Sequence, residues 1–239
     1  MVLLVLALAA AGVALLADVS LQLERDRQID EARRHVLSRI ATMDQGWRQA
    51  AYALGQQLEL WQGGDTDETV RRARLQVGLV SALEQGDFSN ALLQGADGQV
   101  LLRLGTRSQA QPPLPSGSAA LAWSWSEADQ TVYRVVDGGS MRFGIDAARL
   151  RVFAPIEPSV LARMVFPGNE LALQRGGRTL AAAGQAGVAP GDTPARLAVR
   201  WDGLPDAPDL LIVRQVSPLL RPKSSITAMR SCEPVLLRS

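Results

Sequence analysis

The residues best suited to bind a ligand lie in and after a segment that holds two tryptophans two positions apart. Trp123 and Trp125 project to one face if the segment is a strand, because side chains alternate along a strand. Later strands place Tyr133 and Arg134 on opposite faces and add Arg142. An arginine beside aromatic rings can hold a carboxylate or a phosphate through paired hydrogen bonds. These five residues are our candidate ligand-binding site. The other interpretation is that the tryptophans cover the core or the stalk and the arginines form the polar face of half-buried strands, which is what regularly spaced aromatic residues usually do.

The sequence lacks the groups that most enzymes and metal sites require. Its single histidine, His35, lies in a charged helical segment, and its single cysteine, Cys232, lies near the C-terminus. Nucleophilic catalysis needs a base held beside the nucleophile. No glycine-rich loop ends in Lys-Ser/Thr, and no G-x-G-x-x-G turn links a strand to a helix. Asp137 and Asp146 are explained by a turn and a strand end, so we expect no enzymatic activity, no metal and no cofactor.

Length and composition indicate a folded protein. The chain has 239 residues, 25 basic and 24 acidic side chains, a net charge of +1 and 47% hydrophobic residues. This near-balance of charge excludes a strongly basic nucleic-acid-binding protein and a charged disordered tail. The length leaves room for one medium-sized domain and an appendage.

The N-terminal segment has the composition of a membrane helix. Residues 1–17 carry no charge, and the first ionisable side chain is that of Asp18. A run of about 17–25 apolar residues can cross the hydrocarbon core as a helix. A cleaved signal peptide is the alternative, but it would carry basic residues before its apolar stretch. We therefore expect an uncleaved, single-pass anchor.

Two rules bear on which side of the membrane the residues after this anchor lie, and they point in opposite directions. Arg25, Arg27, Arg33 and Arg34 follow the segment and no basic residue precedes it, which by the positive-inside rule would leave the remainder in the cytoplasm. Long domains, however, cross a membrane largely regardless of flanking charge. We therefore expect the remainder to be extracytoplasmic.

Residues 18–62 have the pattern of a long helix without proline. Two rows of apolar side chains recur every seven residues: Ile29, Val36, Met43 and Ala50, and Ile40, Trp47, Leu54 and Trp61. Such a stripe is typical of a coiled coil or of a helix that lies on a sheet. Six acidic residues, among them Asp44, and six arginines favour a solvated opposite face. We expect a stalk helix through which two copies form a homodimer.

The remaining sequence predicts an α+β fold with a mostly antiparallel sheet. A helix over 67–85 begins with a capping pattern at Asp65 and Glu68, and a short helix begins at Pro158. Turn sequences such as Asp97-Gly98 and Asp137-Gly138-Gly139 separate the strands. The predicted strands are 91–94, 100–104, 121–125, 131–136, 141–145, 149–156, 170–174, 179–183, 195–201 and 209–216. The predicted domains are a transmembrane helix (1–17), a stalk helix (18–62), a sensor-like domain (63–217) and an irregular tail (218–239).

This order of elements resembles the Cache-like and CHASE-like, PAS-related extracytoplasmic sensor domains of bacterial transmembrane signalling proteins. The resemblance covers most of residues 1–217. It rests on the membrane and stalk helices, on the hairpin LLQGADGQVL at 92–101, and on a later unit that begins with RVFAPI at 151–156 and continues through ELALQ and GRTL.

The resemblance implies a membrane-anchored input domain that binds a small molecule in the periplasm, attached to the bacterial inner membrane. In that family a second membrane helix leads to an output module such as a diguanylate cyclase, a histidine kinase or a chemoreceptor signalling region. Here Leu219-Leu220 is followed by Arg221-Pro222-Lys223 and no apolar span, so we expect the output module to be absent from this chain. A periplasmic scaffold that holds a protein partner through the stalk and sheet is the alternative, and neither function involves nucleic acid.

Overall fold

The computed structural model describes residues 2–62, 68–105, 120–143, 146–185, 194–202, 204 and 207–214. The chain divides into two compact units, Met1–Asp26 with Val216–Ser239, and Arg27–Gln215. The predicted tail at 218–239, the predicted cap at Asp65 and the loop predicted between the second and third strands lie outside the described residues.

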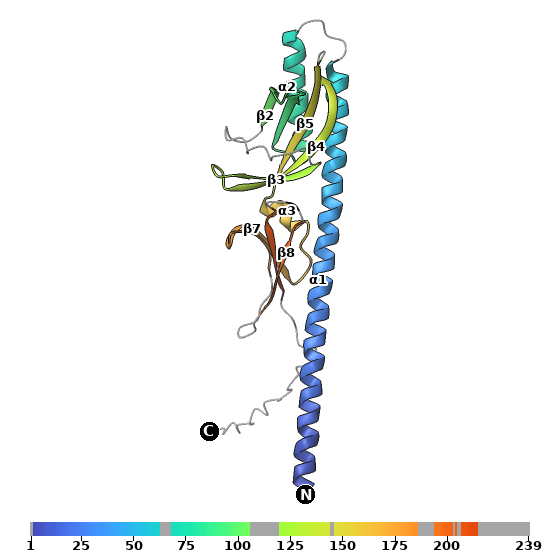
Figure 1. The fold of residues 1–239 in the computed structure, drawn as a ribbon, viewed down its shortest axis with the longest axis vertical. Helices are drawn as coiled ribbons and strands as arrows, with labels where there is room; N and C mark the ends of the chain where they lie inside the picture. Colours follow the sequence, from blue (N-terminus) through green and yellow to red (C-terminus); the bar gives the residue numbers. More distant parts are fainter. Residues whose placement is uncertain are drawn as a thin grey trace, which may run out of the picture. The chain divides into compact units, whose positions relative to one another are not determined.

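The N-terminal helix α1 is continuous over Val2–Gln62 (Figure 1). This continuity confirms that the apolar segment and the predicted stalk form one helix, as expected from a stretch without proline. Over the described residues, no helix has the length and apolar character needed to cross a membrane. The side chains of residues 3–8 and 10, within the predicted membrane helix, lie outside the described residues.

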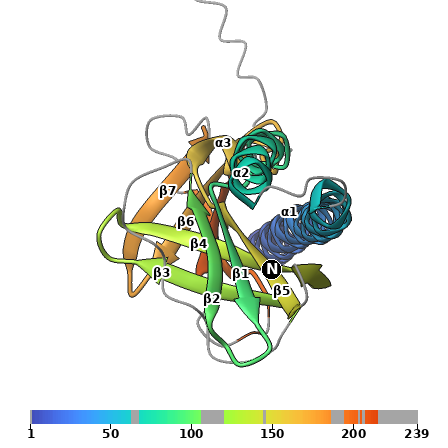
Figure 2. The same ribbon diagram turned by 90° about the horizontal axis from the view of Figure 1, so that it is seen from above.

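The first sheet has five antiparallel strands in the order β2-β1-β5-β4-β3. The strands are β1 (Asn90–Gly95), β2 (Val100–Gly105), β3 (Leu121–Ser126), β4 (Thr131–Phe143) and β5 (Asp146–Pro155). The predicted hairpin is confirmed between β1 and β2, where Gly98 has a φ of 82° that favours glycine. Helix α2 (Glu68–Gln85) lies with α1 on one side of this sheet (Figure 2).

The predicted turn at Asp137-Gly138-Gly139 is wrong, because β4 continues through it with a β-bulge. Its two predicted strands, 131–136 and 141–145, therefore belong to one long strand. A Cβ on Gly138 would lie 2.8 Å from the Ala51 carbonyl oxygen of α1, and a Cβ on Gly55 would lie 2.7 Å from the Gly138 oxygen. Glycine is needed here for the close approach of a helix backbone to a bulged strand, and not for a chain reversal.

The second sheet has four antiparallel strands in the order β7-β6-β9-β8. These are β6 (Asn169–Arg175), β7 (Arg178–Gly184), β8 (Ala195–Arg200) and β9 (Asp209–Arg214), and the short helix α3 (Pro158–Ala162) precedes them. The expectation of one sheet is therefore corrected to two. In the first sheet β1 lies between β2 and β5, and β4 lies on the other side of β5. In the second sheet β6 likewise lies between β7 and β9, and β8 lies on the other side of β9. The second sheet therefore repeats the connectivity of the first with one strand fewer.

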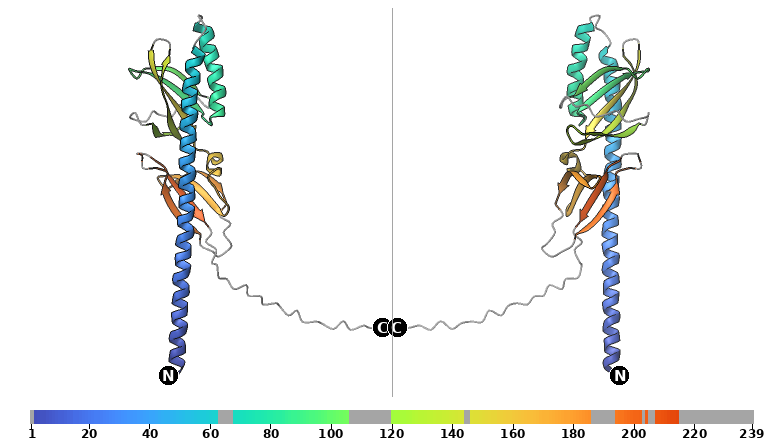
Figure 3. Two further views of the ribbon diagram at one scale, coloured as in Figure 1. Left: turned by 90° about the vertical axis from the view of Figure 1, so that its right-hand side faces the viewer. Right: turned by 60° about the vertical axis from the view of Figure 1, so that its left-hand side comes forward.

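Helix α1 runs alongside both sheets of its own chain (Figures 1 and 3), and the apolar side chains of its stripe belong to the same hydrophobic cluster as those of the sheets. Residues 28 and 35 of α1 contact the region of the second sheet. The His35 ring lies 4.7 Å from the Phe166 ring, and Arg214 of β9 donates to the Gln28 carbonyl. Farther along, Gly55 meets the β4 bulge. The buried stripe consists of Ala32, Val36, Ile40, Trp47, Ala51, Leu54 and Leu58. Of the two interpretations of this stripe, a helix lying on a sheet is the one observed.

Candidate functional site

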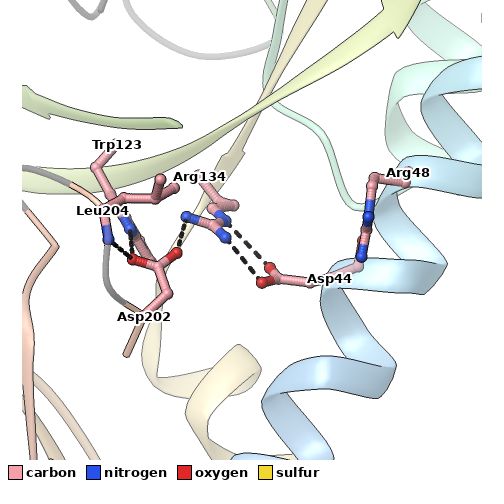
Figure 4. Close-up of polar contacts among 6 residues, drawn as sticks. All are labelled: Asp44, Arg48, Trp123, Arg134, Asp202 and Leu204. Carbon is pink, nitrogen blue, oxygen red and sulfur yellow. Dashed lines mark hydrogen bonds and ion pairs between the residues drawn. The ribbon is translucent and has the colours of Figure 1, made fainter. Parts of the chain in front are cut away.

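The most deeply buried charged side chain among the described residues is that of Arg134, on the helix-facing side of β4 (Figure 4). Its side chain is 1% exposed. Nε lies 3.1 Å from Oδ1 of Asp44, and Nη2 lies 2.8 Å from Oδ2 of the same carboxylate. This bidentate pair joins the five-stranded sheet to α1, and a charge-assisted pair of this geometry is stronger than a neutral hydrogen bond.

A second carboxylate, that of Asp202 after β8, contacts the same guanidinium. Asp202 Oδ2 lies 2.6 Å from Arg134 Nη1, but the two groups are not aligned as a hydrogen bond, so the contact is one of charge with charge. Asp202 Oδ1 accepts from the Trp123 indole N–H at 3.0 Å and from the Leu204 amide at 3.1 Å. We call Asp44, Trp123, Arg134 and Asp202 the Arg134 junction, because they tie α1 and both sheets together at one point.

Aromatic rings complete the surroundings of Arg134. Its guanidinium carbon lies 4.4 Å from the centre of the Trp123 ring, within the range of a cation–π contact. The Trp201 ring meets the Trp123 ring edge to face at 5.2 Å. The planar guanidinium is thus occupied by carboxylates around its edge and by an indole against its plane, and it already has the partners that a ligand carboxylate would supply.

The Arg134 junction contains two acidic side chains and only one basic side chain. Two carboxylates share one guanidinium, and the Asp44 and Asp202 side chains are only 9% and 20% exposed. Burial raises the pKa of Asp44, while the hydrogen bonds and charge of Arg134 act in the opposite direction. Burial disfavours a charged carboxyl because the interior solvates it poorly.

The five predicted ligand-binding residues are not brought together at one place. Trp123 and Arg134 meet in the Arg134 junction. Trp125 lies on the same face of the sheet, under the guanidinium of Arg175 at the end of β6. Tyr133 lies on the opposite face, where its ring packs edge-on against Phe153.

The fifth predicted residue, Arg142, lies at the other end of β4. Its backbone amide donates to the Glu59 carboxylate of α1 at 2.9 Å. The ligand-binding role of the five residues stays a prediction, and the geometry assigns Trp123 and Arg134 a second role in joining elements.

Sequence reasoning missed the two carboxylates of the Arg134 junction. The charge pattern of the stalk predicts that Asp44 lies on its solvated face, whereas Asp44 is 7% exposed. The sequence did contain a signal, since Asp44 falls four residues after Ile40 and three before Trp47, inside the apolar stripe of a helix. No comparable signal marks Asp202, because its position depends on how the second sheet meets the first.

A groove of about 370 Å³ lies between the end of α2 and α3. Its lining consists of Glu84, Asp87, Phe88, Ser89, Pro155, Glu157, Ser159, Val160 and Arg163. Arg163 pairs with Asp87 through both terminal nitrogens, and this pairing lowers the pKa of Asp87. The arginine of the groove, Arg163, is therefore already paired with a carboxylate of the groove, Asp87. Among the described residues, no three His, Cys, Asp or Glu side chains gather in a way that could hold a metal ion.

Comparison with known proteins supports the fold. No family model matches the chain, and no curated protein matches it. The structure is similar to the crystal structure of the Vibrio cholerae LuxQ periplasmic domain, with a TM-score of 0.54 and 12% sequence identity, over 78% of this chain and 97% of that chain. At this identity the likeness establishes the fold alone. It agrees with the predicted α+β, PAS-like architecture with a long N-terminal helix, and the narrower Cache-like or CHASE-like assignment stays a prediction.

Proposed function

We propose that this chain is the extracytoplasmic input region of a bacterial signal-transduction receptor, of the Cache-like or CHASE-like class, which binds a small molecule. The observation that carries the proposal is one helix packed on two sheets of repeated connectivity, in a fold similar to that of the LuxQ periplasmic domain. Enzymatic output, such as that of a diguanylate cyclase or a histidine kinase, would belong to a module outside this chain.

The proposal includes a single-pass anchor in the inner membrane, with the two sheets in the periplasm. It is supported by the uncharged sequence of residues 1–17 and by the continuity of α1 from Val2 to Gln62. Protease treatment of spheroplasts tests it. We expect the region after Asp18 to be digested without membrane lysis, and protection of that region until lysis would contradict the orientation.

The mechanism would be a shift of population between two arrangements of the sheets against α1. A ligand can shift such an equilibrium only as far as it binds one arrangement more tightly than the other. The helix is coupled to the sheets through the Arg134 junction and through the close approach of Gly55 to Gly138. A rearrangement of either sheet would therefore change the contacts of α1.

A thermal-shift screen of the detergent-solubilised chain against amino acids, carboxylates and other small metabolites tests the sensor role. A ligand at one hundred times its Kd stabilises the native state by about 2.7 kcal/mol. For a protein of this size, that corresponds to a rise in Tm of about 5–10 °C. If the predicted residues bind the ligand, Trp125→Ala should abolish the rise, and Val70→Ala, at an exposed residue of α2, should preserve it. The absence of any stabilising compound would contradict the sensor role.

A homodimer through α1 is also proposed, but its interface would differ from the apolar stripe. Ile40 and Leu54 are 4% and 3% exposed within the chain's own core, so the stripe is already occupied. Tyr52 and Leu60 of α1 are 59% and 76% exposed and offer a different face for a second copy. Tyr52→Glu should lower the molar mass measured by light scattering if this face is used, and an unchanged mass would exclude it.

A periplasmic scaffold remains the second candidate function. The observation in its favour is the exposed apolar surface of the helices, since Val77 of α2 is 73% exposed in addition to Leu60. Exposed apolar residues that cluster mark interaction sites. A scaffold would co-purify with one protein partner through these residues and would show no stabilisation by small molecules, so the thermal-shift screen separates the two candidates.

A further inference from the structure

The Arg134 junction holds one more negative charge than positive charge in a largely dry setting. One guanidinium at 1% exposure faces two carboxylates, at 2.8 Å and 2.6 Å. Isolated buried charge is costly, and a buried carboxyl without a full partner usually takes up a proton instead. We therefore expect one of the two carboxylates of the Arg134 junction to take up a proton readily.

The contacts decide which carboxyl takes that proton. Asp202 accepts hydrogen bonds from the Trp123 indole and the Leu204 amide as well as facing Arg134 (Figure 4). Such donors stabilise the ionised form of a carboxyl. Among the described residues, the Asp44 carboxylate accepts from Arg134 alone. Asp44 is also the more buried of the two, so the proton goes to Asp44.

Within the part of the chain that the structure describes, three charged groups act on Asp44. Arg134 faces it from β4, Asp202 from the segment after β8, and Arg48 from the next turn of α1. The Arg48 guanidinium donates to the Asp44 backbone carbonyl at 3.4 Å, and its charge acts on the carboxylate from a distance. Burial outweighs these cations and raises the pKa of Asp44, in agreement with the contact pattern.

We propose that the Arg134 junction is a proton-responsive clamp, in which protonation of Asp44 tightens the contact of α1 with the two sheets. Once protonated, Asp44 leaves Arg134 and Asp202 as a neutral one-to-one pair, and its carbonyl oxygen can still accept from Arg134. When ionised, it returns the excess charge and weakens the clamp. This inference concerns the chain's own residues and does not depend on the proposed ligand or on membrane anchoring.

The direction of the pH effect follows from linkage. A carboxyl whose pKa is higher in the folded than in the unfolded chain binds its proton more tightly when folded. Asp44 therefore contributes stability that is fully present at low pH and is lost as the pH rises through its raised pKa. Ordinary acidic ion pairs show the opposite trend, which makes the effect recognisable.

The test compares the unfolding of the full chain between pH 4 and pH 7 in the wild type and in three variants. Asp44→Asn removes the titrating group, and Asp202→Asn removes the excess charge that disfavours its ionisation. Asp87→Asn is the matched control, because Asp87 is also paired with an arginine but lies at the surface. Hydrogen exchange of the α1 amides around Asp44, corrected for the intrinsic exchange rate, measures how firmly α1 is held against the sheets.

We expect the unfolding constant of the wild type to rise with pH relative to that of Asp44→Asn, by about tenfold for each unit by which the pKa is raised. Protection of the α1 amides should fall over the same pH range in the wild type and in Asp87→Asn, and should be constant in Asp44→Asn. In Asp202→Asn it should fall at lower pH than in the wild type, because burial still disfavours ionised Asp44 but the charge of Asp202 no longer does. An Asp44→Asn variant with the same pH dependence as the wild type would overturn the proposal.

A measurement on the wild type covers the case in which a variant does not fold. The Trp123 indole N–H donates to Asp202, which shares Arg134 with Asp44. The NMR resonance of the indole should therefore respond to the titration of Asp44, at a pH above the usual aspartate value of about 3.9. An indole resonance that shows no titration above that value would also overturn the proposal.

Discussion

Gly46 and Gly55 of α1 provide a matched pair of substitutions with opposite expected effects. A Cβ at Gly46 would meet no heavy atom within 4 Å. A Cβ at Gly55 would lie 2.7 Å from the backbone oxygen of Gly138, in the β4 bulge. The same change to alanine therefore tests helix propensity alone at one position and helix propensity plus packing at the other.

The magnitudes follow from these two environments. Gly46→Ala should stabilise the protein by about 1 kcal/mol, because alanine is the better helix former. Gly55→Ala gains the same amount but forces two backbones apart, and overpacking of this kind costs about 1–3 kcal/mol. The two variants should therefore differ by about 1–3 kcal/mol, which corresponds to about 2–12 °C in Tm.

Thermal and urea unfolding of the full chain, monitored by circular dichroism and by tryptophan fluorescence, measure this difference. Coincident transitions in the two signals would license a two-state analysis. If Gly55→Ala stabilises the protein as much as Gly46→Ala does, then α1 does not lie against the bulge. The interpretation that glycine is needed in Asp137-Gly138-Gly139 for the close approach of the α1 backbone would then be refuted.

Two ion pairs give further predictions. Arg134→Met should destabilise the protein by about 3–5 kcal/mol in urea unfolding, because it leaves Asp44 and Asp202 without their shared cation. Adding Asp44→Leu should recover part of this loss. Full stability of the single variant would refute the arrangement of the three side chains. Asp87→Asn should cost less than about 1 kcal/mol at pH 7, since the pair with Arg163 is exposed. Because the pKa of Asp87 is lowered, this cost should begin to shrink below the unfolded aspartate value of about 3.9 and should vanish once the pH falls through the lowered pKa of the folded chain. A cost that grows with acidity would contradict the assignment.

Much of the local structure could be predicted from the sequence. The strands from Asn90 to Arg214 were found to within a few residues, with the exception of the two predicted segments that form β4. The hairpin at Gly98 and the short helix at Pro158 were also predicted correctly. These features depend on side-chain periodicity, on positive φ and on the missing N–H of proline, all of which act over a few neighbouring residues.

The role of Asp137-Gly138-Gly139 could not be predicted in this way. The same three residues suit a tight turn and a bulge equally well. Local chemistry cannot choose between them, because the choice depends on whether another backbone approaches. Here the Ala51 carbonyl of α1 lies against Gly138, and Asp137 pairs with Arg149 of β5.

The α+β class, the long uninterrupted helix and the small number of catalytic groups follow from composition and periodicity, which are properties of the amino-acid sequence alone. The pairing of the strands into two sheets of repeated connectivity, the covering of the α1 stripe by its own chain, and the convergence of Asp44 and Asp202 on Arg134 emerge only on folding. The Arg134 junction, for example, depends on contacts between residues about 70 to 90 positions apart, Arg134 with Asp202 and Asp44 with Arg134. Periodicity tells which face of an element is buried, but not which distant element buries it.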